Sequence, residues 1–275
     1  MAKPDIWTRI QRIDVRAIYA IAGLVICAFV LQPVVLPLPV STGTRMMYDF
    51  IEKLPAGSAV VMSQEHTVGF WPECGPGAVA VWTHAFKRPL KLIFVAFIAD
   101  GALMTHTALT TLVDKGDKKY GEDYVQIGFV AGEEAGVAAF AKDFTMPRSD
   151  YFGTPLETLP LLQKAKSAKD IALWVVTGSI GNYWVLRQVN AAYNVPQATV
   201  TMAGLEPTFL PYLASGQFVG MVNSVRGGAE YENLLKIPGG FGNQMMGAVT
   251  AGTGAVFFLV IFGNMVYWIQ RRKRE

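Results

Sequence analysis

The pattern of apolar and polar positions divides the chain into two long apolar segments and a mixed middle part. The apolar segments are residues 17–40 and 245–269, and neither contains Asp, Glu, Lys or Arg. About 20 apolar residues in a helix cross the roughly 30 Å hydrocarbon core of a bilayer. We therefore expect a transmembrane helix at each position, with basic tails at 1–16 and 270–275.

The first apolar segment ends in a proline-rich run at residues 33–39. Proline cannot continue a helix interior, so we expect the helix to end near there and an extended chain to follow. A cleaved signal peptide is the alternative, but its apolar part is usually about 7 to 15 residues long. The length of this segment favours a retained membrane anchor.

The middle part, residues 41–244, alternates short apolar runs with segments of helical periodicity. Strands are predicted at 58–63, 90–99, 124–130, 171–177, 197–202 and 218–223. Helices are predicted at 44–54, 77–87, 102–112, 133–144, 183–193, 207–215 and 229–235. Parallel strands need a crossover of about a dozen residues, which these helices supply. The fold class is therefore α/β, a Rossmann-like or flavodoxin-like three-layer domain with a mainly parallel sheet.

The distribution of charge along the chain predicts how the chain is oriented in the membrane. The chain has 24 basic and 21 acidic residues, of which 16 basic and 18 acidic ones lie in the middle part, so no nucleic-acid surface is expected there. Basic residues lie outside both apolar segments, which by the positive-inside rule places both termini in the cytoplasm and the domain outside it. The inverted orientation is the alternative. The two cysteines, Cys27 and Cys74, lie in different parts of the chain and predict no disulfide framework.

Candidate binding residues follow the predicted strands. Ligands of such sheets bind beyond the carboxyl ends of the strands, where helix N-termini present free N–H groups. The residues that we select there as candidate ligand-binding positions are Glu65, His66, Asp100, Gly178, Ser179, Gly181, Asn182, Glu206, Arg226 and Glu230. Together they predict a polar rim at one edge of the sheet.

No complete catalytic or cofactor motif occurs among these residues. Residues 178–182 open a helix after a strand but lack the full GxGxxG spacing and a Walker lysine, so a simple glycine turn is the preferred interpretation. Glu65, His66, Glu73 and Cys74 match no established metal site. A hydrolase would need Ser63 or Ser179 with His66 as base. We expect no metal and no cofactor.

The second apolar segment carries small residues at every fourth position, Gly247, Ala251 and Ala255. Small residues on one face of a helix allow another helix to approach closely. We expect this face to pack against the first apolar segment or against another subunit.

The string at 226–232, Arg-Gly-Gly-Ala-Glu-Tyr-Glu, is the most distinctive local sequence, and we interpret it as a glycine turn followed by an acidic helix start. Together with residues 13–14, the proline-rich run and the stretch 44–58, it resembles a family of uncharacterised prokaryotic membrane proteins. The resemblance covers most of the chain and implies the two-anchor arrangement, but no activity.

These features favour a non-catalytic, membrane-anchored structural or assembly subunit of a larger membrane complex. Its expected partners are the membrane and other integral membrane subunits or copies of itself. One alternative is a small-ligand-binding or sensory module that uses the polar rim. The other is a membrane-tethered hydrolase.

Overall fold

The computed structural model describes residues 13–32 and 37–272. The chain forms two compact units, an α/β unit at Pro37–Gly242 and a helical unit that includes Asn243 and the residues after it. The described part of the helical unit consists of α2 (Val15–Leu31) and most of α12 (Phe241–Arg272).

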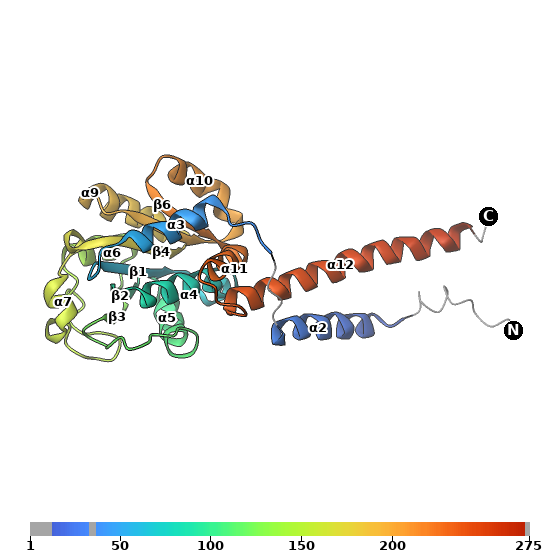
Figure 1. Cartoon of the computed structure of the whole chain (residues 1–275), viewed down its shortest axis with the longest axis horizontal. Coiled ribbons are helices and arrows are strands. Elements are labelled where there is room, and N and C mark those ends of the chain that lie inside the picture. Colours follow the sequence, from blue (N-terminus) through green and yellow to red (C-terminus); the bar gives the residue numbers. More distant parts are fainter. Residues whose placement is uncertain (1–12, 33–36, 273–275) are drawn as a thin grey trace. The chain divides into compact units, whose positions relative to one another are not determined.

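A six-stranded parallel sheet forms the centre of the α/β unit (Figure 1). Its strands are β1 (Ala59–Glu65), β2 (Lys91–Ala96), β3 (Tyr124–Phe129), β4 (Ile171–Gly178), β5 (Gln197–Thr201) and β6 (Phe218–Asn223). The order across the sheet is β3-β2-β1-β4-β5-β6, with every neighbouring pair parallel. The parallel pairing confirms the predicted parallel α/β class. The strand order is that of Rossmann folds and not that of flavodoxin.

Helices cover both faces of the sheet. One face packs against α3 (Thr42–Lys53), α4 (Trp71–Lys87), α5 (Ala99–Thr111) and α11 (Ser224–Leu234). The other packs mainly against α6 (Glu133–Lys142), α7 (Pro160–Lys164) and α8 (Gly181–Val185), which continues through a π-helical stretch at Leu186–Asn190 into α9 (Ala191–Tyr193). The remaining helix, α10 (Glu206–Ala214), packs against β6. Short 3₁₀ turns lie at Val68–Phe70, Leu156–Thr158, Ala168–Asp170 and Ala203–Leu205.

The central strands are apolar on both faces because both faces are covered. In β1, Val60 and Met62 pack toward α3 and α4, whereas Val61 packs toward α6 and α8. All three side chains are completely buried. The continuous apolar runs that predicted the strands are therefore the direct consequence of this two-sided burial.

Two helices begin at least five residues earlier than the sequence predicts. Helix α4 begins at Trp71 and not at residue 77, because Pro72 occupies its first turn and Pro76 is accommodated inside it. Helix α11 begins at Ser224 and not at residue 229, so Gly227 and Gly228 lie inside a helix and not in a turn. Pro76 and Gly228 lie where these two helices touch, since a Cβ at Gly228 would lie 2.8 Å from Pro76 C.

The first apolar helix is shorter than predicted. Helix α2 has 17 residues and ends at Leu31, whereas the expected segment extended to residue 40. At 1.5 Å per residue it is about 26 Å long, and residues 33–36 of the predicted segment lie outside the described residues. By contrast, α12 has 32 residues and is long and apolar enough to cross a bilayer.

Gly220 of β6 permits the close packing of α3 on the sheet. A Cβ atom at this position would lie 2.4 Å from Met47 Cα and 2.6 Å from Met47 N, which are backbone atoms of α3. We expect Gly220→Ala to lower the free energy of unfolding by about 1–3 kcal/mol, since the helix must move away. Denaturant unfolding of the detergent-solubilised chain measures this. Gly204→Ala, where a Cβ has no atom within 4 Å, is the control, and equal midpoints for the two variants would contradict the account.

Candidate functional site

The carboxyl ends of β1 and β4 meet at the point where the strand order reverses, which is the ligand site of Rossmann folds. Here Glu65 lies opposite Gly178 in the register of the two strands. A Cβ at Gly178 would lie 2.2 Å from Glu65 O, and one at Gly181 would lie 2.2 Å from Glu65 Cγ. The Glu65 side chain thus lies directly under the turn that leads into α8 and fills this crevice.

Glu65 is a buried carboxyl group, with 1% of its surface exposed. Its Oε2 accepts a hydrogen bond from Phe97 N at 3.2 Å, and its Oε1 has no partner within the described residues. Burial raises the pKa of Glu65 well above its usual range, although the Phe97 N–H and the Ser63 hydroxyl oppose that shift. Burial therefore favours the neutral form of this group.

His66 contacts backbone and amide groups and not a nucleophile. Its Nδ1 lies 3.0 Å from Thr67 O, and its Nε2 lies 3.3 Å from Gln64 Oε1. Burial lowers the pKa of His66, which favours the neutral ring. Ser63 Oγ accepts a hydrogen bond from Trp174 Nε1 at 2.9 Å. No serine hydroxyl or carboxylate is hydrogen-bonded to His66 in the described part of the chain, so the predicted hydrolase constellation is not assembled in this conformation.

Several other candidate residues hold the rim together internally. Asn182 donates to Gly178 O at 3.1 Å and accepts from Gln197 Nε2 at 3.2 Å, which fixes the turn that contains Ser179. Asp100 Oδ2 accepts from Val68 N at 3.0 Å, and Glu206 accepts a hydrogen bond from the side chain of Asn223. These contacts connect neighbouring loops, and they use the polar groups that the sequence suggested for ligands.

The four residues considered for a metal do not form a metal site. Glu73 Oε1 accepts hydrogen bonds from Ala203 N at 2.7 Å and from Ser224 Oγ at 3.2 Å. Burial raises the pKa of the Cys74 thiol to about 12, which leaves no thiolate at neutral pH. Among residues 13–32 and 37–272, no group of three or more His, Cys, Asp or Glu side chains is placed to hold a metal ion.

The distinctive string at 226–232 lies in α11 and joins three helices through glycine. A Cβ at Gly228 would lie 2.8 Å from Gly77 N in α4. A Cβ at Gly242, in the first turn of α12, would lie 2.6 Å from Gly228 C. Helices α4 and α11 and the beginning of α12 therefore meet backbone to backbone, which only glycine permits.

Two buried carboxylates of the same helix hold the points where the chain enters and leaves the α/β unit. Glu230 Oε2 accepts a hydrogen bond from Ser41 N at 2.9 Å, immediately before α3, and its Oε1 accepts from Arg226 Nε at 2.8 Å. Glu232 Oε1 accepts from Gly242 N at 2.7 Å, at the beginning of α12. Arg226 and Glu230, which were expected at the ligand rim, thus belong to this connection. We call Gly228, Glu230, Tyr231 and Glu232 of α11 the anchor junction.

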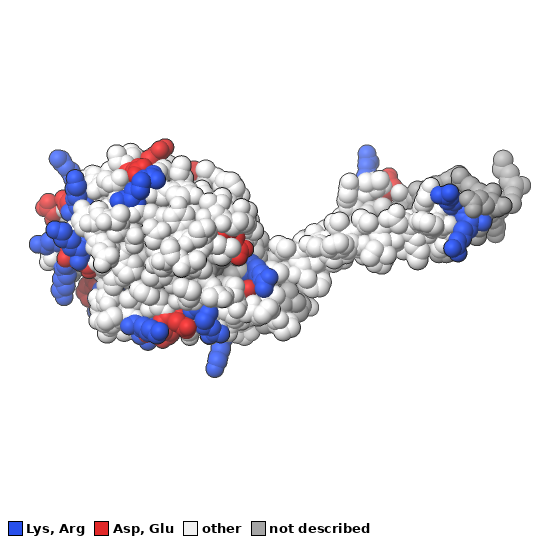
Figure 2. Space-filling model, turned by 90° about the horizontal axis from the view of Figure 1, so that it is seen from above, with Lys and Arg blue, Asp and Glu red and all other residues white. Residues whose placement is uncertain are grey.

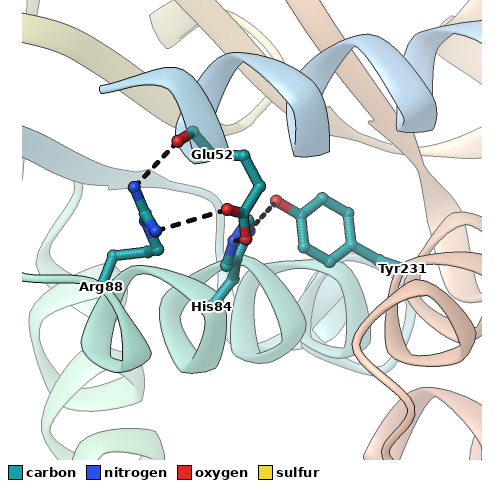
Figure 3. Close-up of polar contacts among 4 residues, drawn as sticks. All are labelled: Glu52, His84, Arg88 and Tyr231. Atoms are coloured by element: carbon teal, nitrogen blue, oxygen red, sulfur yellow. Dashed lines mark hydrogen bonds and ion pairs between the residues drawn. The ribbon is translucent and has the colours of Figure 1, made fainter. Parts of the chain in front are cut away.

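Tyr231 extends the anchor junction across α4 to α3 (Figure 3). Its hydroxyl lies 2.8 Å from His84 Nδ1, and His84 Nε2 lies 2.8 Å from Glu52 Oε1. Arg88 Nη2 donates to Glu52 O at 2.8 Å. Burial lowers the pKa of His84, although Glu52 opposes that shift. A neutral ring satisfies every partner, since it accepts the Tyr231 proton at Nδ1 and donates at Nε2.

Sequence reasoning could not find this network. His84 and Glu52 are 32 residues apart, and His84 and Tyr231 are 147 residues apart. No short motif encodes such contacts. The available signal was the string at 226–232 itself, but its interpretation as a glycine turn followed by a helix start is wrong, because all seven residues lie inside α11.

The ionisation of Glu65 provides a pH test. A pKa raised in the folded state gives stability that is complete below the ordinary value of 4.5 and is lost as the pH rises through the folded-state pKa. Gln cannot ionise, so we expect the stability of Glu65→Gln relative to the wild type to increase steadily with pH. Unfolding free energies between about pH 5 and pH 9 measure this. Glu157→Gln on an exposed turn is the control, and a difference that does not change with pH would contradict the assignment.

Removal of the Tyr231 hydroxyl tests the anchor junction. Tyr231→Phe leaves His84 Nδ1 buried without a partner, which costs about 1–3 kcal/mol. Tyr193→Phe is the matched control, because the Tyr193 ring is half-buried and its hydroxyl makes no hydrogen bond in the described residues. Thermal unfolding of both variants gives the comparison. Equal stabilities would show that the Tyr231 contact contributes nothing.

No family model matches this chain, and no curated protein matches it with significance. The resemblance noted from the sequence therefore supplies no residue roles.

Proposed function

We propose that this chain is a non-catalytic, membrane-anchored subunit of a larger membrane assembly. The observation that carries the proposal is the anchor junction. Through Glu230 and Glu232, one buried helix binds both the residue that precedes α3 and the first turn of α12. These contacts hold the two ends of the α/β unit, Ser41 and Gly242, against one helix. A structural subunit needs such a rigid attachment between its domain and its membrane anchors.

Helix α12 is the proposed membrane anchor. It contains an 18-residue stretch of mean hydropathy 2.0, of which 11% is buried. It carries no charged residue before Arg271 and Arg272, and Figure 2 shows the corresponding white surface with basic side chains at its end. At 32 residues it is about 48 Å long, which exceeds the roughly 30 Å hydrocarbon core. The basic end would lie in the cytoplasm and the α/β unit outside it.

Helix α2 would be the second anchor and would pair with α12. A Cβ at Gly247 would lie 3.6 Å from Phe29 O, and one at Gly252 would lie 3.5 Å from Ile26 Cδ1. Ala251 is buried on the same side, whereas Ala255 is half-buried. The approaches of Gly247 and Gly252 to α2 support this pairing, which would leave the remaining apolar surface of α12 for lipid or other subunits.

The geometry of the rim favours this role over catalysis or ligand binding. Glu65 fills the crevice at the strand-order reversal, and Asn182, Asp100 and Glu206 are engaged in internal hydrogen bonds. A hollow of about 720 Å³ lies at the opposite edge, beside the amino ends of β1, β2 and β4. A small-ligand site remains the second candidate, because the partnerless Glu65 Oε1 could serve a polar ligand that reaches it.

Native mass after gentle extraction from the membrane tests the proposal. We expect a particle that contains several copies or other membrane chains. Ala251→Leu adds bulk at a buried small residue of α12, so we expect it to reduce the mass. Gly254→Leu is the control, because a Cβ at Gly254 meets no atom within 4 Å.

A wild-type chain that is extracted alone as a monomer would contradict the assembly role. An unchanged mass for Ala251→Leu would contradict the dependence of assembly on the pairing of α2 with α12. A monomer that is stabilised against heat by a small metabolite would favour the ligand-binding alternative instead.

A further inference from the structure

The hollow beside the amino ends of β1, β2 and β4 is a cavity that the proposed function does not use. Its volume is about 720 Å³, within the range of about 300–1,000 Å³ that is typical of small-molecule sites. Ligands of Rossmann folds bind at the carboxyl ends of the strands, so the fold alone gives this hollow no role. All of its lining residues belong to the α/β unit.

Part of the wall of the hollow is apolar. Leu161, Ala165 and Ile171 line it and are 4%, 5% and 8% exposed, respectively. The same three side chains belong to the hydrophobic core on the α6 and α8 face of the sheet. Small-molecule sites are lined mainly by apolar side chains, with a few polar groups that fix the orientation of the ligand. This wall therefore suits the hydrocarbon part of a ligand.

Three lysines, Lys91, Lys164 and Lys169, line the same hollow. Lys91 Nζ donates to Asp123 Oδ1 at 2.8 Å, so its charge is paired. The ammonium groups of Lys164 and Lys169 make no hydrogen bond and no ion pair within the described part of the chain. Two positive charges at the hollow are thus available to a ligand.

Two acidic residues also line the hollow, and they differ in their contacts. Asp170 Oδ2 accepts hydrogen bonds from Lys166 N and Ser167 N, both at 2.9 Å. Glu122 makes no hydrogen bond or ion pair among the residues that the structure describes. Asp170 is therefore engaged by the backbone, whereas the carboxylate of Glu122 weakens the attraction of the hollow for an anion.

The segment that carries Lys164 and Lys169 is held at several points. Leu161 N donates to Gly121 O at 2.9 Å, and Phe144 N donates to Lys166 O at 2.8 Å. The hydrogen bonds of Asp170 close the turn between the two lysines. The backbone of the site is thus ordered before a ligand arrives, which lowers the entropic cost of binding.

We propose that this hollow binds a small organic anion. The hydrocarbon body of the ligand lies against the apolar wall, and its phosphate or carboxylate group lies near the ammonium groups of Lys164 and Lys169. The lysine side chains are exposed, so salt screens their attraction for the ligand. The site is separate from the assembly role proposed above and does not depend on it.

Calorimetric titration with naphthyl phosphate tests the site on the full chain in a nonionic detergent. Naphthylmethylamine, which has the same ring system and a positive charge, is the control ligand, and the heat of empty micelles is subtracted for both. We expect the phosphate to bind several-fold more tightly than the amine, because the unpaired charges of Lys164 and Lys169 favour an anion. We expect its affinity to fall as salt is added.

Substitutions of opposite sign locate the binding. We expect the double variant Lys164→Gln and Lys169→Gln to bind naphthyl phosphate several-fold more weakly, and Glu122→Gln to bind it more tightly. Lys142→Gln is the matched control, because Lys142 is exposed at the end of α6 and does not line the hollow. All four substituted side chains are exposed, so the variants are expected to melt like the parent.

Absence of binding by naphthyl phosphate, or equal affinities for the two probes, overturns the inference. An affinity that the double lysine variant leaves unchanged also overturns it. A loss as large in Lys142→Gln as in the double variant would show nonspecific attraction to surface lysines, and it has the same consequence. The native mass of the particle addresses the assembly role separately, so either proposal can fail while the other stands.

Discussion

The backbone contact between α11 and its neighbours is the constraint on which the arrangement of the α/β unit depends. Gly228 allows α4 and the first turn of α12 to touch α11, and no larger residue fits there. Once the helices are this close, Glu230 and Glu232 reach the chain entry at Ser41 and the chain exit at Gly242. The two acidic side chains therefore accept backbone hydrogen bonds from two other segments of the chain. The local sequence of α11 does not predict this role.

The same constraint organises the polar interior between the helices. Tyr231 can reach His84 only because α11 and α4 are in contact, and His84 in turn carries the connection to Glu52 of α3. His84 and Tyr231 are buried, and without these hydrogen bonds their polar atoms would be unpaired, at a cost of about 1–3 kcal/mol each. Three helices on one face of the sheet are thereby locked together.

The sequence predicts the fold class well because a strand that is buried on both faces needs apolar residues at consecutive positions. Each strand is a continuous apolar run, so the α/β class follows from the alternation of elements. The same alternation places Glu65 and Gly178 at the carboxyl ends of their strands. It could not reveal that Glu65 fills the crevice under Gly181, nor that Pro76 and Gly228 lie inside helices, because those features depend on contacts between distant residues.

Native-state hydrogen exchange of α11 tests the central claim most directly. If α11 locks the entry and exit of the chain, its amides exchange only through global unfolding, as slowly as those of β1 and β4. The account predicts one shared free energy of opening for these three elements, reduced together in Tyr231→Phe. Exchange of α11 through a separate local opening, at a free energy well below that of the strands, would contradict its role as the junction.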